Sequence, residues 1–210
     1  LRALSGQPPG TVIPVIYGLT GRYKDASPDG ARNTRANALR PEQLLLATNL
    51  SDSYLGWHVS GVTMDGSGDV HFALTAGGYE RMARRIALSL RNRLAEGAYD
   101  GRGPLATTLT RTSTNNFEIA VNLNGAASLS GSALTGYEIS INGFSSSLTI
   151  SSIGVSGGKV VIVTTGDDGT SQAQVRNYRG FDPADSSNAL GTYPDGTTIE
   201  LFPIIVPLAT

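Results

Sequence analysis

The sequence Asp65-Gly-Ser-Gly-Asp-Val-His-Phe72 leads directly into Ala73-Leu-Thr-Ala-Gly-Gly-Tyr-Glu-Arg-Met-Ala-Arg-Arg-Ile-Ala-Leu-Ser-Leu90. In its second part, apolar residues recur at helical spacing, at Tyr79, Met82, Ala83, Ile86, Leu90 and Leu94. This pattern predicts an amphipathic helix that begins near Thr75 and packs its apolar stripe on a sheet. The arginines avoid the stripe, so we expect them on the solvent side of the helix.

The segments before this stretch predict alternating strands and helices. The expected elements are a strand at Val12–Tyr17, a surface loop at Leu19–Asn37, a helix at Pro41–Ala47 and a strand at Tyr54–Met64. Pro14 cannot donate to a strand ladder, which favours an edge position or a strand that starts at Val15. The order strand, helix, strand, loop, helix predicts an α/β fold.

The pattern changes after Glu96–Pro104, where glycine and proline crowd together. We predict a boundary there, with an α/β domain at residues 1–99 and an all-β sandwich at residues 100–210. Strands are expected at Leu105–Thr112, Asn116–Leu123, Tyr137–Asn142, Leu148–Ile153, Lys159–Thr165, Gln172–Tyr178 and Thr198–Ile205. Asp167–Gly169 and Asp195-Gly196 read as hairpin turns between them.

The composition argues against nucleic-acid and membrane partners and indicates where the protein is located. Only 16% of the 210 residues are charged and the net charge is −1, so the chain lacks the basic stripe that nucleic-acid binding needs. No apolar run approaches the roughly 20 residues that span a bilayer, so no membrane partner is expected. A surface kept soluble by hydroxyls, amides and glycine indicates an extracellular, periplasmic or virion-associated protein. Cysteine is absent.

Asp69 and His71 are the candidate catalytic residues. In an extended segment, residues i and i+2 project to the same side, so Asp69 can orient the ring of His71. The other ring nitrogen is then free to act as a general base. Asp65, Asp69 and His71 are too few ligands for a typical metal site, and we predict neither a metal nor a cofactor. His58, beside Trp57, is interpreted as a packing residue.

Aromatic residues in the C-terminal half have two interpretations. Tyr137, Tyr178, Phe181 and Tyr193 could stack on sugars. Aromatic side chains between strands more often belong to a hydrophobic core, and we expect that role here.

The Asp69-Val-His-Phe72 block, followed by Gly78-Tyr79 and an arginine-rich helix, resembles the last conserved block of SGNH hydrolases, most closely the sialate O-acetylesterase-like branch. The Val12–Gly18 strand and the Leu39–Gln43 segment match more loosely. The resemblance implies that residues 1–99 are the C-terminal part of a flavodoxin-like SGNH hydrolase domain. It also implies that the β-rich residues 100–210 are an accessory sandwich.

The sequence departs from this family in lacking a nucleophile. It contains no Gly-Asp-Ser motif, and its Gly-x-Ser-x-Gly sequence at Gly154–Gly158 falls at a turn signal between two expected strands, where a strand-to-helix nucleophile elbow is not expected. The resemblance therefore implies that the serine lies upstream of residue 1, in the same polypeptide, and that the chain alone is catalytically incomplete.

The sequence is compatible with two functions. The first is a carbohydrate O-acetylesterase, a serine ester hydrolase acting on an acetylated glycan or surface polysaccharide. The alternative is a non-catalytic carbohydrate-binding or structural module of a phage tail, spike or cell-surface protein. Homo-oligomerisation is left open in both.

Overall fold

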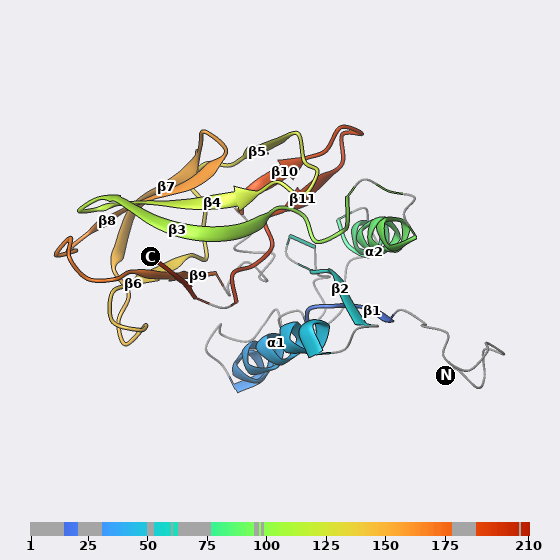
Figure 1. The fold of residues 1–210 in the computed structure, drawn as a ribbon, viewed down its shortest axis with the longest axis horizontal. Coiled ribbons are helices and arrows are strands. Elements are labelled where there is room, and N and C mark those ends of the chain that lie inside the picture. Colours follow the sequence, from blue (N-terminus) through green and yellow to red (C-terminus); the bar gives the residue numbers. More distant parts are fainter. Residues whose placement is uncertain are drawn as a thin grey trace.

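The structure, a computed structural model, describes residues 15–20, 31–49, 53–59, 61–62, 77–94, 97, 99–177, 188–205 and 207–210. The N-terminal elements are β1 (Val15–Gly18), α1 (Ala31–Asn49), β2 (Ser53–Trp57) and α2 (Tyr79–Arg93). Ten strands follow: β3 (Leu105–Ser113), β4 (Asn116–Asn122), β5 (Ser128–Ser130), β6 (Glu138–Ser140), β7 (Thr149–Ser156), β8 (Lys159–Thr165), β9 (Gln174–Arg176), β10 (Leu190–Thr192), β11 (Thr198–Glu200) and β12 (Leu208–Ala209). Figure 1 shows their arrangement.

The predicted fold class, a partial flavodoxin-like α/β domain followed by an all-β sandwich, is wrong. The described chain is mostly β, with several small sheets, and parallel pairing among its strands is limited to β1 and β2. A flavodoxin-like domain is built on an open sheet of several parallel strands, and one parallel pair does not supply it. The order of the first four elements was predicted correctly. The domain boundary at residues 99 and 100 stays a prediction.

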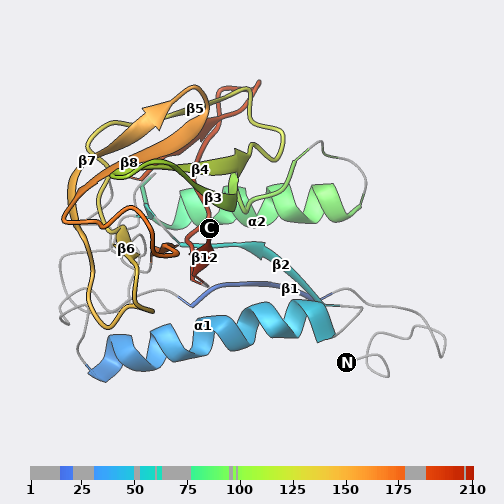
Figure 2. The ribbon, with the colours of Figure 1, turned by 60° about the vertical axis from the view of Figure 1, so that its left-hand side comes forward.

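The two helices cover opposite faces of the parallel pair β1–β2. On one face, the hydroxyl of Tyr17 donates to the carbonyl of Gln43 in α1 at 2.5 Å, and that of Ser53 donates to the carbonyl of Leu46 at 2.8 Å. On the other face, Ser89 of α2 donates to the carbonyl of Gly56. Figure 2 shows the two strands lying between α1 and α2.

Helix α1 begins ten residues earlier than the sequence predicted. Pro41 lies inside the helix, where its missing N–H leaves the carbonyl of Asn37 without the usual intrahelical donor. The side chain of Arg40 donates to the Asn37 side chain and, through Nε, to the carbonyl of Thr20 at 2.8 Å. The prediction of a loop over residues 19–37 was therefore wrong for residues 31–37, which are helical. This segment is polar and lacks the apolar periodicity from which a helix is predicted.

Helix α2 begins at Tyr79, later than the predicted start near Thr75, and packs mostly through residues outside the predicted apolar stripe. Gly78 is its N-cap and makes no side-chain capping bond, and Thr75 lies outside the described residues. The residues buried in this helix are Arg85 and Ser89. The large members of the predicted apolar stripe stay partly exposed: Tyr79 at 41%, Ile86 at 36%, Leu90 at 47% and Leu94 at 57%. The prediction that the whole stripe packs on a sheet was wrong: Met82 packs against the cluster that contains Leu55 of β2, whereas the other large members stay partly exposed.

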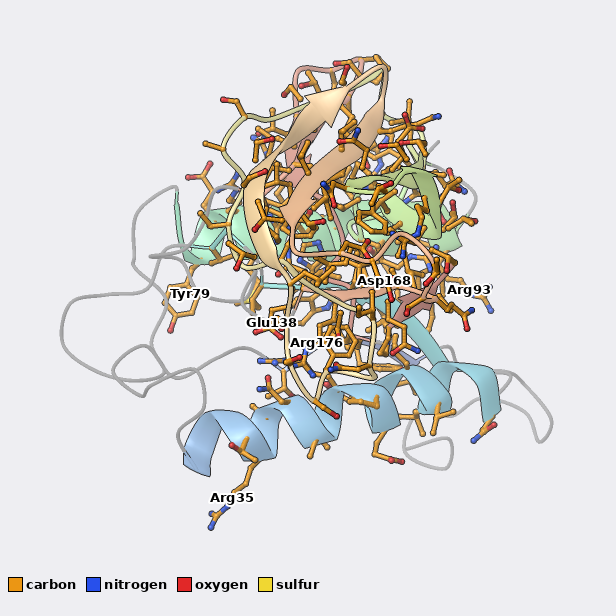
Figure 3. All side chains as sticks on the ribbon, turned by 90° about the vertical axis from the view of Figure 1, so that its left-hand side faces the viewer. Arg35, Tyr79, Arg93, Glu138, Asp168 and Arg176 are labelled. Atoms are coloured by element: carbon orange, nitrogen blue, oxygen red, sulfur yellow. The ribbon has the colours of Figure 1, made fainter. Side chains whose placement is uncertain are left out.

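The strands after residue 104, here called the β region, form three antiparallel sheets. Their orders are β3-β4-β8-β7, β11-β10-β5 and β12-β9-β6. The predicted alternation is confirmed at Phe117 and Ile119, which are fully buried in the main core. Between β6 and β9, Arg176 Nε donates to Glu138 at 2.7 Å from the directly opposite position (Figure 3).

All seven predicted strands of the β region are present in some length, while β5, β10 and β12 were not predicted. Each has two or three residues, too few for an alternating pattern to register. Asp195-Gly196 forms the predicted hairpin turn between β10 and β11. Asp167–Gly169 instead links β8 to β9, which belong to different sheets, so a hairpin there was wrong.

Candidate functional site

The predicted catalytic residues Asp69 and His71 lie outside the described residues, as does Asp65. Their roles stay predictions. The described neighbour of this motif is the start of α2, because Gly77 follows His71 by six residues in the sequence.

A buried charge cluster joins α2 to the β region. The Arg85 side chain is 1% exposed; it donates to the carboxylate of Glu200 in β11 and to the carbonyl of His58 at 2.6 Å. Arg81 Nη2 lies 2.8 Å from the other oxygen of Glu200. Burial lowers the pKa of Arg85, and the adjacent Glu200 carboxylate opposes that shift. The cluster is a fixed structural joint, with both carboxylate oxygens occupied by guanidinium groups.

His58 belongs to this joint and has no access to solvent. Its Nε2 lies 2.9 Å from the carbonyl of Arg102, so Nε2 carries the proton and donates it. Its ring packs edge-on against Phe202, with centroids 5.2 Å apart. Burial, and secondarily the charge of Arg85, holds the pKa of His58 well below 6.5. The predicted packing role is confirmed, and His58 is no candidate for an accessible base.

Asp100 forms a second buried connection between the N-terminal elements and the β region. Its carboxylate accepts hydrogen bonds from the Tyr54 hydroxyl at 2.6 Å, the Arg102 guanidinium at 2.7 Å and Asn124 Nδ2 at 2.9 Å. Burial alone would raise the pKa of Asp100, but the bonds from Arg102 and Tyr54 outweigh it and the pKa is lowered. Burial and the bond to Asp100 raise the pKa of Tyr54 to about 12. These hydrogen bonds hold β2 and Asn124 of the β region together. Both oxygens of the Asp100 carboxylate accept hydrogen bonds, so this carboxylate is not a candidate general base.

Of the four C-terminal aromatic residues considered for sugar stacking, Tyr137 and Tyr193 lie within the described chain and serve packing, as predicted. Tyr137 is 7% exposed and donates its hydroxyl to Asn188 Oδ1 at 2.7 Å. Tyr193 is 1% exposed and stacks on Tyr99 with ring centroids 4.0 Å apart. Tyr178 and Phe181 lie outside the described residues.

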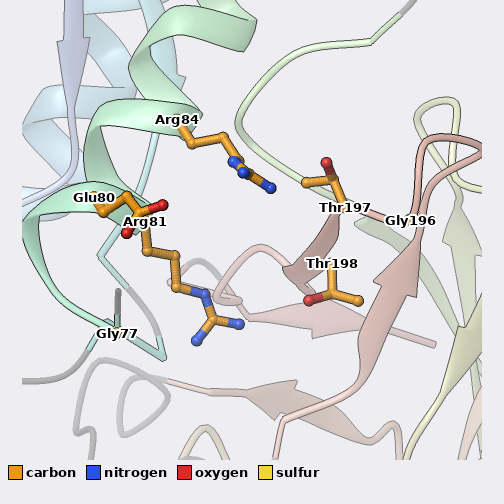
Figure 4. Close-up of a pocket in the computed structure, with 7 residues that line it drawn as sticks. All are labelled: Gly77, Glu80, Arg81, Arg84, Gly196, Thr197 and Thr198. Carbon is orange, nitrogen blue, oxygen red and sulfur yellow. The ribbon is translucent and has the colours of Figure 1, made fainter. Parts of the chain in front are cut away.

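A polar pocket of about 450 Å³ opens beside the first turn of α2. It is lined by Gly77, Glu80, Arg81, Arg84, Gly196, Thr197 and Thr198. Figure 4 shows the two arginine side chains extending from α2 toward the β10–β11 hairpin, which carries both threonines. The volume of the pocket is within the range of small-ligand sites.

Both walls of this pocket are held in place. Arg81 is fixed by Glu200 and by the carbonyl of Gly61 at 2.8 Å, whereas Arg84 is exposed. In the hairpin, Asp195 accepts hydrogen bonds from the Thr197 backbone at 2.9 Å and from the Tyr99 hydroxyl at 2.6 Å. Guanidinium and hydroxyl groups on rigid walls suit a polyhydroxylated or anionic ligand.

Sequence reasoning missed this pocket because its walls are more than a hundred residues apart in the chain. The arginines were predicted to be on the solvent side of α2, which is confirmed for Arg84, Arg91 and Arg93. It is wrong for Arg85, which is buried against Glu200. The hairpin threonines carry no local signal that distinguishes them from other β-region residues.

Comparison with solved structures finds a fold likeness that covers the whole chain. A carbohydrate acetylesterase from Xanthomonas citri matches with a TM-score of 0.67 and 15% identity, over 100% of this chain and 43% of that protein. At this identity the likeness shows a shared, distantly esterase-like fold. The chain spans less than half the length of that esterase.

Two further matches are structures of the bacterial S-layer protein SbsC. The N-terminal part of SbsC matches with a TM-score of 0.36 and 11% identity, over 64% of this chain and 28% of that one. A longer SbsC structure gives 0.35 and 11%, over 64% and 16%. These scores are too low to indicate a common fold. No protein-family model and no curated protein sequence matches the chain.

The described helices include none that is long and apolar enough to cross a membrane.

Proposed function

We propose that the chain is part of a carbohydrate O-acetylesterase, a serine ester hydrolase, and that it contributes Asp69 and His71 to the active site. The observation that carries the proposal is the fold likeness of the entire chain to a carbohydrate acetylesterase. The Asp69-Val-His-Phe72 motif, which is separated from α2 by six residues of sequence, supplies the proposed base and its orienting carboxylate. That motif is also the basis for the finer assignment to the SGNH hydrolases and their sialate O-acetylesterase-like branch.

In the proposed mechanism, a serine upstream of residue 1 attacks the carbonyl carbon of an acetyl ester. His71 accepts the serine proton as the new C–O bond forms, and Asp69 stabilises the resulting imidazolium. Collapse of the tetrahedral intermediate breaks the bond to the sugar oxygen, which leaves with the proton from His71. A water molecule, deprotonated by His71, then hydrolyses the acetyl-serine to acetate. Neither a metal nor a cofactor takes part in these steps.

The pocket at the start of α2 supplies a binding surface for the sugar part of the substrate. The Arg84 guanidinium and the Thr198 hydroxyl are donors that suit glycan hydroxyl or carboxylate groups. An acetylated glycan or surface polysaccharide as the substrate is consistent with an extracellular, periplasmic or virion-associated location.

The test uses the complete natural polypeptide and an acetylated polysaccharide, with acetate release as the measurement. His71→Ala should reduce kcat by about 10²–10⁴-fold, and Asp69→Asn should also reduce it, while the melting temperature is retained. Glu118→Gln neutralises a surface carboxylate paired with Lys159 in the β region and is the matched control for Asp69→Asn. Full activity of the His71→Ala variant would refute the assigned base. An inactive natural polypeptide would favour the non-catalytic alternative.

A further inference from the structure

The pocket at the start of α2 contains a guanidinium group that has no counter-charge. Arg84 is exposed, and within the part of the chain that the structure describes it forms no ion pair or hydrogen bond. An arginine side chain keeps its positive charge at any physiological pH. It extends from α2 across the opening toward the β10–β11 hairpin (Figure 4). The charge of Arg84 is therefore available to a ligand in the pocket.

Arg81 supplies a second guanidinium group, which is fixed in place one turn earlier in the helix. Its Nη2 lies 2.8 Å from Glu200 Oε1, and its Nη1 donates to the carbonyl of Gly61 at 2.8 Å. The same Glu200 carboxylate also binds Arg85, so it neutralises Arg81 only in part. The pocket lies at the N-terminal end of α2, where the helix dipole is positive. Arg81 therefore adds positive potential from a fixed position.

Positive charge outweighs negative charge in the pocket. The lining residues that the structure describes carry two positive charges, on Arg81 and Arg84, and one negative charge, on Glu80. Glu80 is exposed, so water and salt screen its repulsion of an anionic ligand. The whole chain has a net charge of −1, so the positive sign of the pocket is a local property. An anionic group is therefore the expected ligand.

The opposite wall of the pocket supplies a hydroxyl group. The side chain of Thr198 in β11 makes no hydrogen bond to a described residue, and Figure 4 shows its hydroxyl oxygen on the side that faces Arg81. The hairpin that carries Thr198 is held by Asp195, which accepts hydrogen bonds from the Thr197 backbone and the Tyr99 hydroxyl. Donors therefore reach the pocket from two walls, and both walls are fixed.

Donors on two walls favour a tetrahedral anion over the other groups that a glycan carries. A planar carboxylate has two oxygens, and a single guanidinium satisfies both of them in a bidentate contact. A phosphate or sulfate ester presents three oxygens in different directions, so it can accept from Arg84 and from Thr198 at the same time. A neutral hydroxyl would leave the charge of Arg84 uncompensated. With about 450 Å³, the pocket has room for a sugar ring together with such an ester.

We propose that this pocket binds a phosphate or sulfate ester of the glycan, with Arg84 as its main ion-pair partner and Thr198 as a hydrogen-bond donor. The inference deepens the proposed function, on which it rests, because it places the substrate among the phosphorylated or sulfated glycans. Arg84 and Thr198 are then specificity-determining residues, which contact the substrate away from the acetyl group that is removed.

The experiment is isothermal titration calorimetry of the complete natural polypeptide with glucose 6-phosphate, glucose 6-sulfate, glucuronate and glucose. The better bound of the first two identifies the ester, and its Kd should be several-fold lower than the Kd of glucuronate or of glucose. Glucose 6-sulfate and glucuronate each carry one negative charge, so their comparison isolates the tetrahedral group from the planar one. Equal or tighter binding of glucuronate or glucose would overturn the proposal.

Four variants test the assigned residues. Arg84→Ala should raise the Kd of the ester by about 10–150-fold, and Thr198→Val should raise it several-fold. Arg35→Ala is the matched control for Arg84→Ala and should leave the Kd unchanged, because Arg35 is also exposed and unpaired among the described residues but lies on α1 (Figure 3). Glu80→Gln should lower the Kd, because it removes a repelling charge. A higher Kd for Glu80→Gln would mean that Glu80 accepts hydrogen bonds from sugar hydroxyls, and would overturn the proposal.

None of these binding measurements depends on hydrolysis. Ester binding that Arg84→Ala abolishes, in a polypeptide that releases no acetate, would refute the esterase and keep the anion site. Acetate release by a polypeptide that binds neither glucose 6-phosphate nor glucose 6-sulfate would refute the anion site and keep the esterase.

Discussion

The guanidinium of Arg85 in α2 is buried against the carboxylate of Glu200 in β11, across 115 residues of sequence. Removing two charges from water costs free energy, which the pair recovers only through close mutual contact and further hydrogen bonds. Arg85 has its further bond to the His58 carbonyl, and Glu200 has a second partner in Arg81. The pair therefore fixes how α2 sits on the β region.

Removing the carboxylate of this pair should cost more stability than removing the guanidinium. Glu200→Gln leaves the charge of Arg85 buried and uncompensated, for an expected loss of about 3–5 kcal/mol in the free energy of unfolding. Arg85→Met should cost less, because Arg81 still neutralises Glu200. Urea unfolding of both variants measures the difference.

The control for these variants is Lys159→Met. It breaks the exposed pair between Lys159 and Glu118, which should be worth at most about 1 kcal/mol. Equal losses for Glu200→Gln and Lys159→Met would contradict the assignment of the Arg85–Glu200 pair as a buried joint.

His58 should make the protein less stable as the pH falls below about 6.5. The unfolded chain binds a proton at this residue near its ordinary pKa of 6.5, whereas burial keeps the folded ring neutral to lower pH. Between these two pKa values the unfolded state holds more protons, so the free energy of unfolding falls by up to about 1.4 kcal/mol per pH unit. The loss is absent above the unfolded pKa.

The measurement is chemical unfolding of the wild type and of His58→Gln between about pH 8 and pH 5. Glutamine can still donate to the Arg102 carbonyl but does not titrate. The charged groups around the ring, Arg81, Arg85 and Glu200, are the same in both proteins, so the difference between the two profiles isolates His58. Parallel profiles would show that the ring titrates normally in the folded state.

Gly103 should tolerate alanine less well than Gly157. Both have positive φ, 78° and 56°, so alanine at either position costs about 1–2 kcal/mol of backbone strain. A methyl group on Gly103 would lie 2.5 Å from the backbone oxygen of Glu200, while one on Gly157 would have nothing within 4 Å. We expect Gly103→Ala to lose about 1–3 kcal/mol more, measured by thermal or urea unfolding. Equal effects would mean that the chain between β2 and β3 can shift away from β11.

Local patterns in the sequence predicted the identity and order of most elements. The strict alternation around Phe117 and Ile119 located β4 and its buried face. Pro14 favoured an edge position or a strand that starts at Val15, and β1 is described from Val15. The fold class failed because it depended on how many parallel strands assemble, which is a non-local property. Two described parallel strands, β1 and β2, do not make the expected domain.

The packing of α2 could not be predicted from its own sequence. Arg85 is buried because Glu200, in a distant hairpin, supplies its counter-charge, and no local pattern encodes that partner. Within the predicted apolar stripe of the same helix, Met82 packs against the cluster around Leu55, whereas Ile86 and Leu90 stay partly exposed. The pocket beside α2 was missed for the same reason, since its second wall is the hairpin around Thr197.

Arg84 should affect substrate binding more than the chemical step. Its side chain lies at the pocket beside α2, is exposed, and faces the hairpin that carries Thr197 and Thr198 (Figure 4). In the complete natural polypeptide, Arg84→Ala should raise KM for an acetylated polysaccharide by about 10–150-fold, the loss of one charge-assisted hydrogen bond, and leave kcat nearly unchanged. With 4-nitrophenyl acetate, which has no sugar, the variant and the wild type should be equal.

The matched control for this variant is Arg91→Ala, which removes an exposed arginine from the same helix outside the pocket. It should change neither kinetic constant with either substrate. If Arg84→Ala lowers kcat on the small ester as well, Arg84 acts at the reacting centre and the sugar-binding role is wrong. If it leaves both substrates unaffected, the glycan binds elsewhere and the pocket has no part in recognition.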